Sequence, residues 1–236
     1  MSEPPRKRMV RPPGGGRDSG RGLGQRLKTA KSRTPSSQAW LERQLNDPYV
    51  AEAKARGYRS RAAFKLIELD DAARLIGRGA RAIDLGCAPG GWLQVLGERG
   101  AGQVVGIDLL SVEPLASATI LKGDFTDPAC QAQLAELVGG LADLVLSDMA
   151  PNTTGHRQTD HIRIIGLIEA AAEFALSVLK PGGALVAKAF QGGETAEAIA
   201  HLKRHFDRVR PLKPKASRAE SAEVYLVATG FRGSSL

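Results

Sequence analysis

Beyond the first 35 residues, the chain alternates between two kinds of hydrophobic pattern. Short apolar runs that end near acids or glycines indicate strands, and longer stretches with apolar residues three or four positions apart indicate helices. The pattern predicts strands at 80–85, 103–110, 117–124, 142–148, 184–188, 208–214 and 221–231. It predicts helices at 36–57, 60–75, 91–100, 131–138, 160–179 and 194–206, with residues 180–183 breaking the fifth of them.

The order of these elements indicates an α/β fold. Strands that alternate with helices form a mostly parallel sheet that is covered by helices on both faces. Only a short connection separates the last two predicted strands, which we therefore expect to pair antiparallel at one edge. The prediction is a Rossmann-like, mostly parallel seven-stranded sheet with an antiparallel edge strand and helices on both faces.

Positive charge is concentrated at the N-terminus. Residues 1–33 hold ten of the 33 Lys and Arg residues but only two of the 25 acids, which accounts for the whole net charge of +8. The segment is also rich in Gly, Pro and Ser, a composition that buries too little apolar surface to fold alone. We expect a basic, disordered arm at residues 1–35 and one folded domain at residues 36–236. The arm suits contact with nucleic-acid phosphates, and a solubilising tail is the alternative.

Other features of the composition narrow the class of protein. No run approaches the roughly 20 apolar residues of a membrane span, and no apolar segment follows the basic N-terminus as it does in a secretory signal. Cys87 and Cys130 lack the spacing of a zinc site or redox motif. His201 and His205 are four residues apart but lie in a charged stretch, which favours RNA contact or solvation. We expect a cytoplasmic monomer that needs no membrane and no metal.

A bare turn follows the first predicted strand, in the stretch AIDLGCAPGGW. Gly86, Gly90 and Gly91 permit backbone conformations that other residues avoid, and they let a ligand touch the main chain. Their spacing differs from the GxGxxG of dinucleotide-binding enzymes, so a dehydrogenase is the least favoured function. Asp84, two residues before the turn, disfavours a phosphate and favours a cationic or hydrogen-bonding ligand.

Two further acids end the next predicted strands. Asp108 follows Asp84 by 24 residues, where a carboxylate can accept both hydroxyls of an adenosine ribose. Asp124 ends the third strand and can accept from an adenine amino group. Any one of these acids alone is explained more simply as a helix cap. Together with the glycine turn, they predict an adenosine pocket without a phosphate site, which suits S-adenosylmethionine better than NAD.

Five motifs carry a resemblance to a known family: DLGCAPGGW, GDF, LSDMAPNTTG, KAFQG and SRAESAEVYLVATG. Together they resemble the FtsJ-type ribose 2′-O-methyltransferases over about residues 40–231, nearly everything outside the arm. The resemblance implies the fold of S-adenosylmethionine-dependent methyltransferases, with that molecule as the methyl donor. The likeness is closest to bacterial members that methylate a uridine of 23S ribosomal RNA.

The resemblance also implies the site residues. The family uses a Lys–Asp–Lys–Glu set, which falls here on Lys65, Asp148, Lys188 and Glu223. Glu220 is the less favoured choice for the last of these, because the match to AEVYLVATG sets the register. By the same matching of motifs, the resemblance implies that the methyl-donor pocket is lined by Gly90, Trp92, Asp108, Asp124 and Asp148. Cys87 stands where many relatives have a small residue such as alanine.

The chemistry of methyl transfer requires side chains with the properties of this Lys–Asp–Lys–Glu set. Transfer from a sulfonium to a ribose oxygen requires positioning and removal of the hydroxyl proton. A lysine can take that proton only when uncharged, which burial and a neighbouring cation favour. We expect Lys188, in an otherwise apolar strand, to be the base, with Lys65 and Asp148 orienting the reactants and Glu223 in support. A solvated helix face is an equally good explanation of Lys65.

The expected function is methylation of a uridine ribose in 23S ribosomal RNA, on the assembled or assembling large subunit. The alternatives are a transfer RNA or cap methyltransferase and a catalytically idle RNA-binding assembly factor, although the intact Lys–Asp–Lys–Glu set counts against idleness. The basic runs YRSRAAFK, LKRHFDRVR and PLKPKASR could grip RNA phosphates. Each run alone suits a solvated surface equally well. The loop PNTTGHRQTD is a candidate lid or substrate loop.

Overall fold

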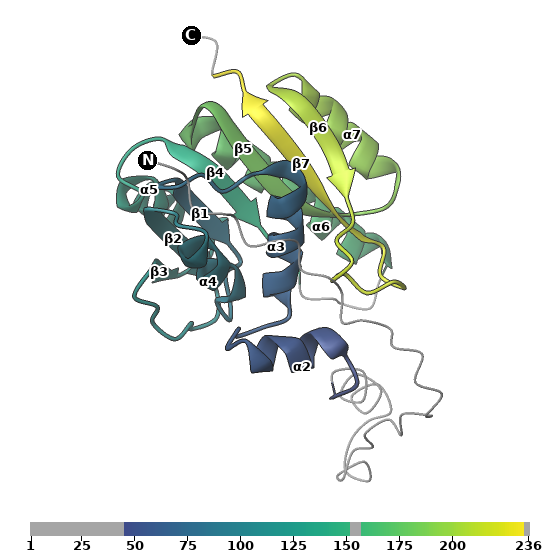
Figure 1. Cartoon of the computed structure of the whole chain (residues 1–236). Coiled ribbons are helices and arrows are strands. Elements are labelled where there is room, and N and C mark those ends of the chain that lie inside the picture. Colours follow the sequence, from purple (N-terminus) through teal and green to yellow (C-terminus); the bar gives the residue numbers. More distant parts are fainter. Residues whose placement is uncertain (1–44, 152–156, 234–236) are drawn as a thin grey trace.

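The computed structural model describes residues 45–151 and 157–233 (Figure 1). Its strands, in chain order, are β1 (Arg81–Leu85), β2 (Gln103–Asp108), β3 (Thr119–Lys122), β4 (Ala142–Ser147), β5 (Leu179–Phe190), β6 (Phe206–Leu212) and β7 (Glu223–Phe231). Its helices are α2 (Pro48–Ala55), α3 (Ala62–Ala73), α4 (Gly91–Glu98), α5 (Pro128–Leu137), α6 (Arg157–Val178) and α7 (Gly193–Lys203). The predicted arm lies outside the described residues, as does most of the loop that follows Asp148.

The strands form one seven-stranded sheet in the order β3-β2-β1-β4-β5-β7-β6. The pairs from β3 across to β5 are parallel, and β7 runs antiparallel to both of its neighbours. This confirms the predicted mostly parallel sheet with its antiparallel pair at one edge, and β7 is the strand next to that edge. The strand order reverses at β1 and β4, which is the place where ligands bind in open α/β sheets.

Two apolar cores lie on the two faces of the sheet. Residues of α5, α6 and α7 pack on one face, and residues of α2, α3 and α4 pack on the other (Figure 1). In β1, Ile83 and Leu85 belong to the first core and Ala82 to the second. Because side chains alternate along a strand, Asp84 points to the face covered by α3 and α4. No described helix is both long enough and apolar enough to cross a membrane.

Several element ends differ from the prediction. Within the predicted 36–57 helix, α2 starts only at Pro48, with Asp47 as its N-cap, because proline lacks the N–H that a helix interior requires. Residues 180–183 lie inside β5, where a register shift in the pairing with β4 absorbs the Pro-Gly-Gly sequence. β5 then continues past Lys188 to Phe190 because β7 pairs with it over that length. β3 ends at Lys122, so Asp124 lies in the following turn.

Gly106, in the middle of β2, lets the glycine turn and α4 pack closely on the sheet. A Cβ at this position would lie 2.9 Å from Sγ of Cys87 and 3.1 Å from Cδ2 of Leu93. Both neighbours are buried, so neither can move away without disturbing other contacts. The small residue therefore sets how near the turn lies to the strand ends.

The substitution Gly106→Ala is expected to lower the free energy of unfolding by about 1–3 kcal/mol, because it overpacks this contact. Urea denaturation measures the change. Gly77→Ala is the matched control, since a Cβ there meets nothing within 4 Å and the backbone is not left-handed. Equal stability of the two variants would contradict the close packing described for Gly106.

Candidate active site

The pairing of β5 with β7 brings the predicted catalytic residues together. Lys188 lies directly opposite Tyr225 in this antiparallel pair, and directly paired side chains share one face of a sheet. Glu223 is two residues before Tyr225 and therefore points to the same face. That face is the one covered by α3, which carries Lys65. Asp148 follows the end of the neighbouring strand β4.

Five polar groups form a closed ring at this place. Lys65 Nζ lies 2.7 Å from Oε1 of Glu223 and donates to the Tyr225 hydroxyl over 3.1 Å. That hydroxyl donates to Oδ1 of Asp148 over 2.6 Å. The same Oδ1 lies 2.8 Å from Nζ of Lys188. A distance of 4.0 Å between Lys188 Nζ and Oε2 of Glu223 closes the ring. The side chains of the predicted Lys–Asp–Lys–Glu set thus lie together at one site. Lys65 belongs to this site and does not lie on a solvated helix face.

The ring is largely shielded from solvent, which strengthens its electrostatics. The four charged side chains are between 9% and 18% exposed. Burial by itself would raise the pKa of Asp148, but the charges of Lys188 and Lys65 outweigh burial and lower that pKa. Burial likewise opposes ionisation of Glu223, and Lys65 again lowers its pKa. Both carboxylates are therefore charged at neutral pH.

Tyr225 and Ser217 are part of the site although sequence reasoning gave them no role. Burial, with Asp148 and Glu223 nearby, raises the pKa of Tyr225 well above its usual value, so the hydroxyl keeps its proton as a donor. Ser217 Oγ donates to Oε1 of Glu223 over 2.8 Å. The signal for Tyr225 was available in SAEVYLV, because a residue two positions after Glu223 in a strand shares its face.

The glycine turn has backbone conformations of the kind that the sequence predicted, which other residues avoid. Gly86 and Gly90 have φ values of 80° and 109°, in the left-handed region that favours glycine. A Cβ at Gly86 would lie 2.8 Å from Cγ of Met149, so the turn also presses on the residue after Asp148. The turn is therefore next to the ring of charged groups. A ligand bound at the turn would approach the main chain directly.

The three acids at the strand ends differ in how they are engaged. Asp108 accepts the N–H groups of Ala88 and Leu110, both over 2.8 Å, and so joins the glycine turn to the segment after β2. Asp124 is exposed and accepts both the N–H and the hydroxyl of Thr126, which lower its pKa. Asp124 does not cap the following helix, whose N-cap is Asp127, and its hydrogen bonds belong to a local turn with Thr126.

Asp84 is fully buried, and neither of its carboxyl oxygens has a hydrogen-bond partner among the described residues. Burial, with Asp148 and Asp108 nearby, raises its pKa well above the usual range. An unpartnered carboxyl beneath a bare turn fits a ligand with positive charge or hydrogen-bond donors and does not fit a phosphate. These residues therefore suit the sulfonium-bearing nucleoside that the sequence predicted.

Trp92 is placed differently from the other residues assigned to the donor pocket. It is 2% exposed, its indole N–H donates to the carbonyl of Ala62 over 2.8 Å, and its ring lies 5.8 Å from that of Tyr225. The side chain therefore joins α4, α3 and β7 in the core. Its contribution to a pocket would come through its main chain at the start of α4.

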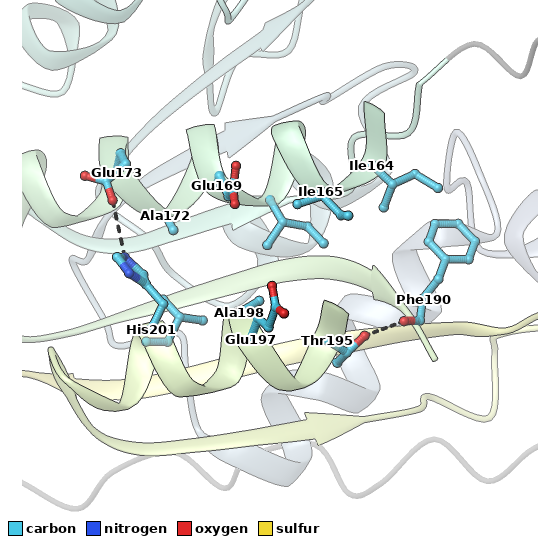
Figure 2. Close-up of a pocket in the computed structure, with 12 residues that line it drawn as sticks. Ile164, Ile165, Glu169, Ala172, Glu173, Phe190, Thr195, Glu197, Ala198 and His201 are labelled. Atoms are coloured by element: carbon cyan, nitrogen blue, oxygen red, sulfur yellow. Dashed lines mark hydrogen bonds and ion pairs between the residues drawn. The ribbon is translucent and has the colours of Figure 1, made fainter. Parts of the chain in front are cut away.

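A hollow of about 370 Å³ lies between α6 and α7, and the predicted site residues are not among those that line it. Figure 2 shows apolar side chains such as Ile164 and Phe190 along it, with Glu169, Glu173 and His201. His201 Nε2 lies 3.3 Å from Glu173 Oε1, so this histidine, for which the sequence favoured RNA contact or solvation, faces α6. Among the described residues, no group of three or more His, Cys, Asp or Glu could hold a metal ion.

The charge ring predicts a specific dependence of stability on pH. Because the pKa of Glu223 is lower in the folded chain, the folded state binds fewer protons than the unfolded state below the ordinary carboxylate pKa. This contribution is present at neutral pH and is lost as the pH falls through the folded pKa. As the pH falls from roughly 5 through the folded pKa of Glu223, Glu223→Gln is therefore expected to lose less unfolding free energy than wild type.

Urea denaturation at several pH values measures this slope. Glu220→Gln is the control, since Glu220 is an exposed carboxylate in the same segment and its removal leaves the ring intact. A slope for Glu223→Gln that matches both wild type and this control would rule out the ionic contribution of Glu223.

Comparisons with known proteins agree with this geometry. The family model for FtsJ-like methyltransferases matches residues 58–231. Ribosomal RNA large subunit methyltransferase E of Caulobacter sp. (strain K31) is 66% identical over 225 residues, which cover 95% of this chain and 100% of that protein. The protein of the same name from Acidiphilium cryptum (strain JF-5) is 63% identical over 207 residues, covering 88% and 92% of the two chains.

A crystal structure with the same fold is also known. A Plasmodium falciparum protein assigned as a ribosomal RNA methyltransferase has a TM-score of 0.68 and 30% sequence identity, and the match covers 75% of this chain and 100% of that one. The resemblance found in the motifs is confirmed by the family model, which spans the glycine turn and all five groups of the ring. The chain is a methyltransferase, and it belongs to the FtsJ-like family.

Proposed function

We propose that this protein transfers a methyl group from S-adenosylmethionine to the ribose 2′-hydroxyl of a uridine in 23S ribosomal RNA, within the assembled or assembling large subunit. The observation that carries the proposal is the convergence of Lys65, Asp148, Lys188 and Glu223 beside the glycine turn. The relatives at 63–66% identity, which are named ribosomal RNA large subunit methyltransferase E, support the substrate. We expect a cytoplasmic monomer.

The residues at the turn support S-adenosylmethionine as the donor. When bound, this molecule supplies a methyl group on a sulfonium, and its sulfur then leaves as a neutral thioether. Gly90 and the main chain of Trp92 would lie along it, Asp108 would accept the ribose hydroxyls, and Asp124 would accept from the adenine. Asp148 would line the pocket as well, and because its carboxylate lies 2.8 Å from Lys188 Nζ it can hold the reacting groups in line.

Lys188 is the proposed base. The substrate hydroxyl gives its proton to the uncharged Nζ of Lys188 while its oxygen gains the methyl group, so charge and atoms balance. Lys188 Nζ is held by the main-chain oxygen of Asp148 at 2.6 Å as well as by its carboxylate, which aims the nitrogen. Lys65 Nζ carries a third N–H besides those directed at Glu223 and the Tyr225 hydroxyl, and this donor can orient the ribose oxygen. Tyr225 holds Lys65 and Asp148 in place for this role.

Replacement of Lys188 tests both the reaction and its base. In the proposed role, Lys188→Met is expected to lower kcat by about 10²- to 10⁴-fold, as loss of a general base does. The assay is transfer of labelled methyl from S-adenosylmethionine to large ribosomal subunits that lack the modification, followed by identification of the labelled ribose.

Lys180→Met is the matched control for this experiment. Lys180 is on the same strand at the opposite end, and it is a half-exposed partner of Asp143, so its loss has little effect on the fold. Label on transfer RNA but not on large subunits would contradict the proposed substrate. Wild-type protein that binds the donor and labels no RNA would favour the idle assembly factor.

The basic arm is proposed to increase RNA affinity without affecting the donor. Deletion of residues 1–33 removes ten basic side chains and is expected to weaken RNA binding. The dependence of log affinity on log salt should also flatten by about 0.7–0.9 for each lost phosphate contact. Salt titrations of RNA binding measure this slope, with donor affinity as the internal control. An unchanged slope would show that the arm makes no phosphate contact.

A further inference from the structure

Arg59, in the basic run YRSRAAFK, has its guanidinium bonded to the protein itself. Nη1 donates to the main-chain oxygens of Pro89 over 3.3 Å and Glu113 over 2.6 Å. Nη2 donates to the main-chain oxygen of Pro114 over 2.9 Å. Three of the five N–H donors of the Arg59 guanidinium thus donate to main-chain carbonyls. The run was expected to grip RNA phosphates, and this arginine is instead largely engaged within the chain.

The three carbonyls belong to two separate segments that flank the glycine turn. Pro89 lies within the turn, one residue before Gly90. Glu113 and Pro114 lie in the segment between β2 and β3, which begins directly after Asp108. Asp108 already joins the turn to this segment through the N–H groups of Ala88 and Leu110. Arg59 makes a second connection between the same two segments.

The packing around Gly90 agrees with this connection. A Cβ at Gly90 would lie 2.9 Å from Nη1 of Arg59 and 3.3 Å from Cδ1 of Leu115, so the arginine and the segment after β2 both press on the turn. The main chain of Arg59 is also held, because its N–H donates to Oε1 of Gln94 on α4 over 2.8 Å. Gln94 Nε2 in turn donates to the carbonyl of Gly57 over 2.9 Å.

Without the guanidinium, three carbonyl oxygens that now converge on one cation would lose their donor. Carbonyl oxygens that point at a common centre repel one another and take up water instead. The two segments would then sample wider separations. A ligand that needs both segments at one spacing binds more weakly, in inverse proportion to the fraction of molecules with that spacing.

We propose that Arg59 is a positioning residue for the methyl donor. It sets the spacing between the glycine turn and the segment after Asp108, and so controls donor affinity without contacting the donor or the RNA. This inference rests on the proposed function, in which these two segments form the walls of the S-adenosylmethionine pocket. Arg59 therefore differs in role from a cation that grips phosphates, although it lies in a basic run.

The test compares Arg59→Met with Arg56→Met. Arg56 is three residues earlier, at the exposed C-cap of α2. It forms an ion pair with Glu52 at 2.6 Å, and its Cζ lies 5.6 Å from the centroid of the Phe64 ring. Both substitutions remove one positive charge from the same part of the surface. Calorimetric titration with S-adenosylmethionine and S-adenosylhomocysteine measures donor affinity, and a separate titration measures RNA affinity.

Arg59→Met is expected to raise the dissociation constant for both donor ligands about tenfold or more, with Arg56→Met unchanged. The KM for the donor should rise in the same proportion, while kcat at saturating donor stays near the wild-type value. RNA affinity should fall equally in the two variants, because each loses one charge. Arg59→Lys should lie between wild type and Arg59→Met, since an ammonium cannot bridge all three carbonyls in a planar fork.

Two outcomes would overturn the proposal. Donor affinity of Arg59→Met equal to wild type, with a loss of RNA affinity beyond that of Arg56→Met, would make Arg59 a phosphate contact. Should Arg59→Met fail to fold, wild-type donor affinity in Arg59→Lys would contradict the positioning role. If wild-type protein itself bound neither donor ligand, the proposed function would fail first, and that result is distinguishable from the other two.

Discussion

The register between β5 and β7 is the constraint on which the site depends. It places Lys188 opposite Tyr225 and turns both toward the face covered by α3. A slip of one residue would turn Lys188 to the other face, where the apolar core beneath α6 and α7 could not accommodate a charge. Residues 224–228 of β7 are buried in succession and pack into the cores on both faces of the sheet, so the packing of the cores also positions the catalytic groups.

The closed ring explains how five polar groups can be held in a nearly dry place. Removing charges from water has a large free-energy cost, which is offset only when each charge meets partners of good geometry. Here each lysine meets a carboxylate within 3 Å, and the Tyr225 hydroxyl both accepts from Lys65 and donates to Asp148. The site is therefore organised before any substrate arrives, which is the state that favours electrostatic catalysis.

Much of the fold followed from local signals in the sequence. The parallel strands and the glycine turn were predictable because the period of the hydrophobic pattern, the turn residues and the small residues are signals that extend over only a few positions. The face on which Tyr225 lies could be predicted from its place two residues after Glu223. Its pairing with Lys188 and the role of Arg59 could not, because they depend on which strands pair and on where a loop folds back. Trp92 was assigned through resemblance alone, and no pattern in its neighbours indicates that its indole bonds to Ala62. For Asp124, the local turn with Thr126 accounts for its hydrogen bonds in the structure.

The closed ring also has a consequence for how such a chain can evolve. Loss of Lys65 alone would leave Glu223 and the Tyr225 hydroxyl without their shared donor, and loss of Glu223 alone would leave two cations facing each other. Each single step is therefore worse than the loss of a complete pair, because an unpaired buried charge costs more than the absence of both partners. Mutational drift one residue at a time is therefore disfavoured at Lys65 and Glu223. Descendants of this chain would inherit the ring whole or abandon it whole.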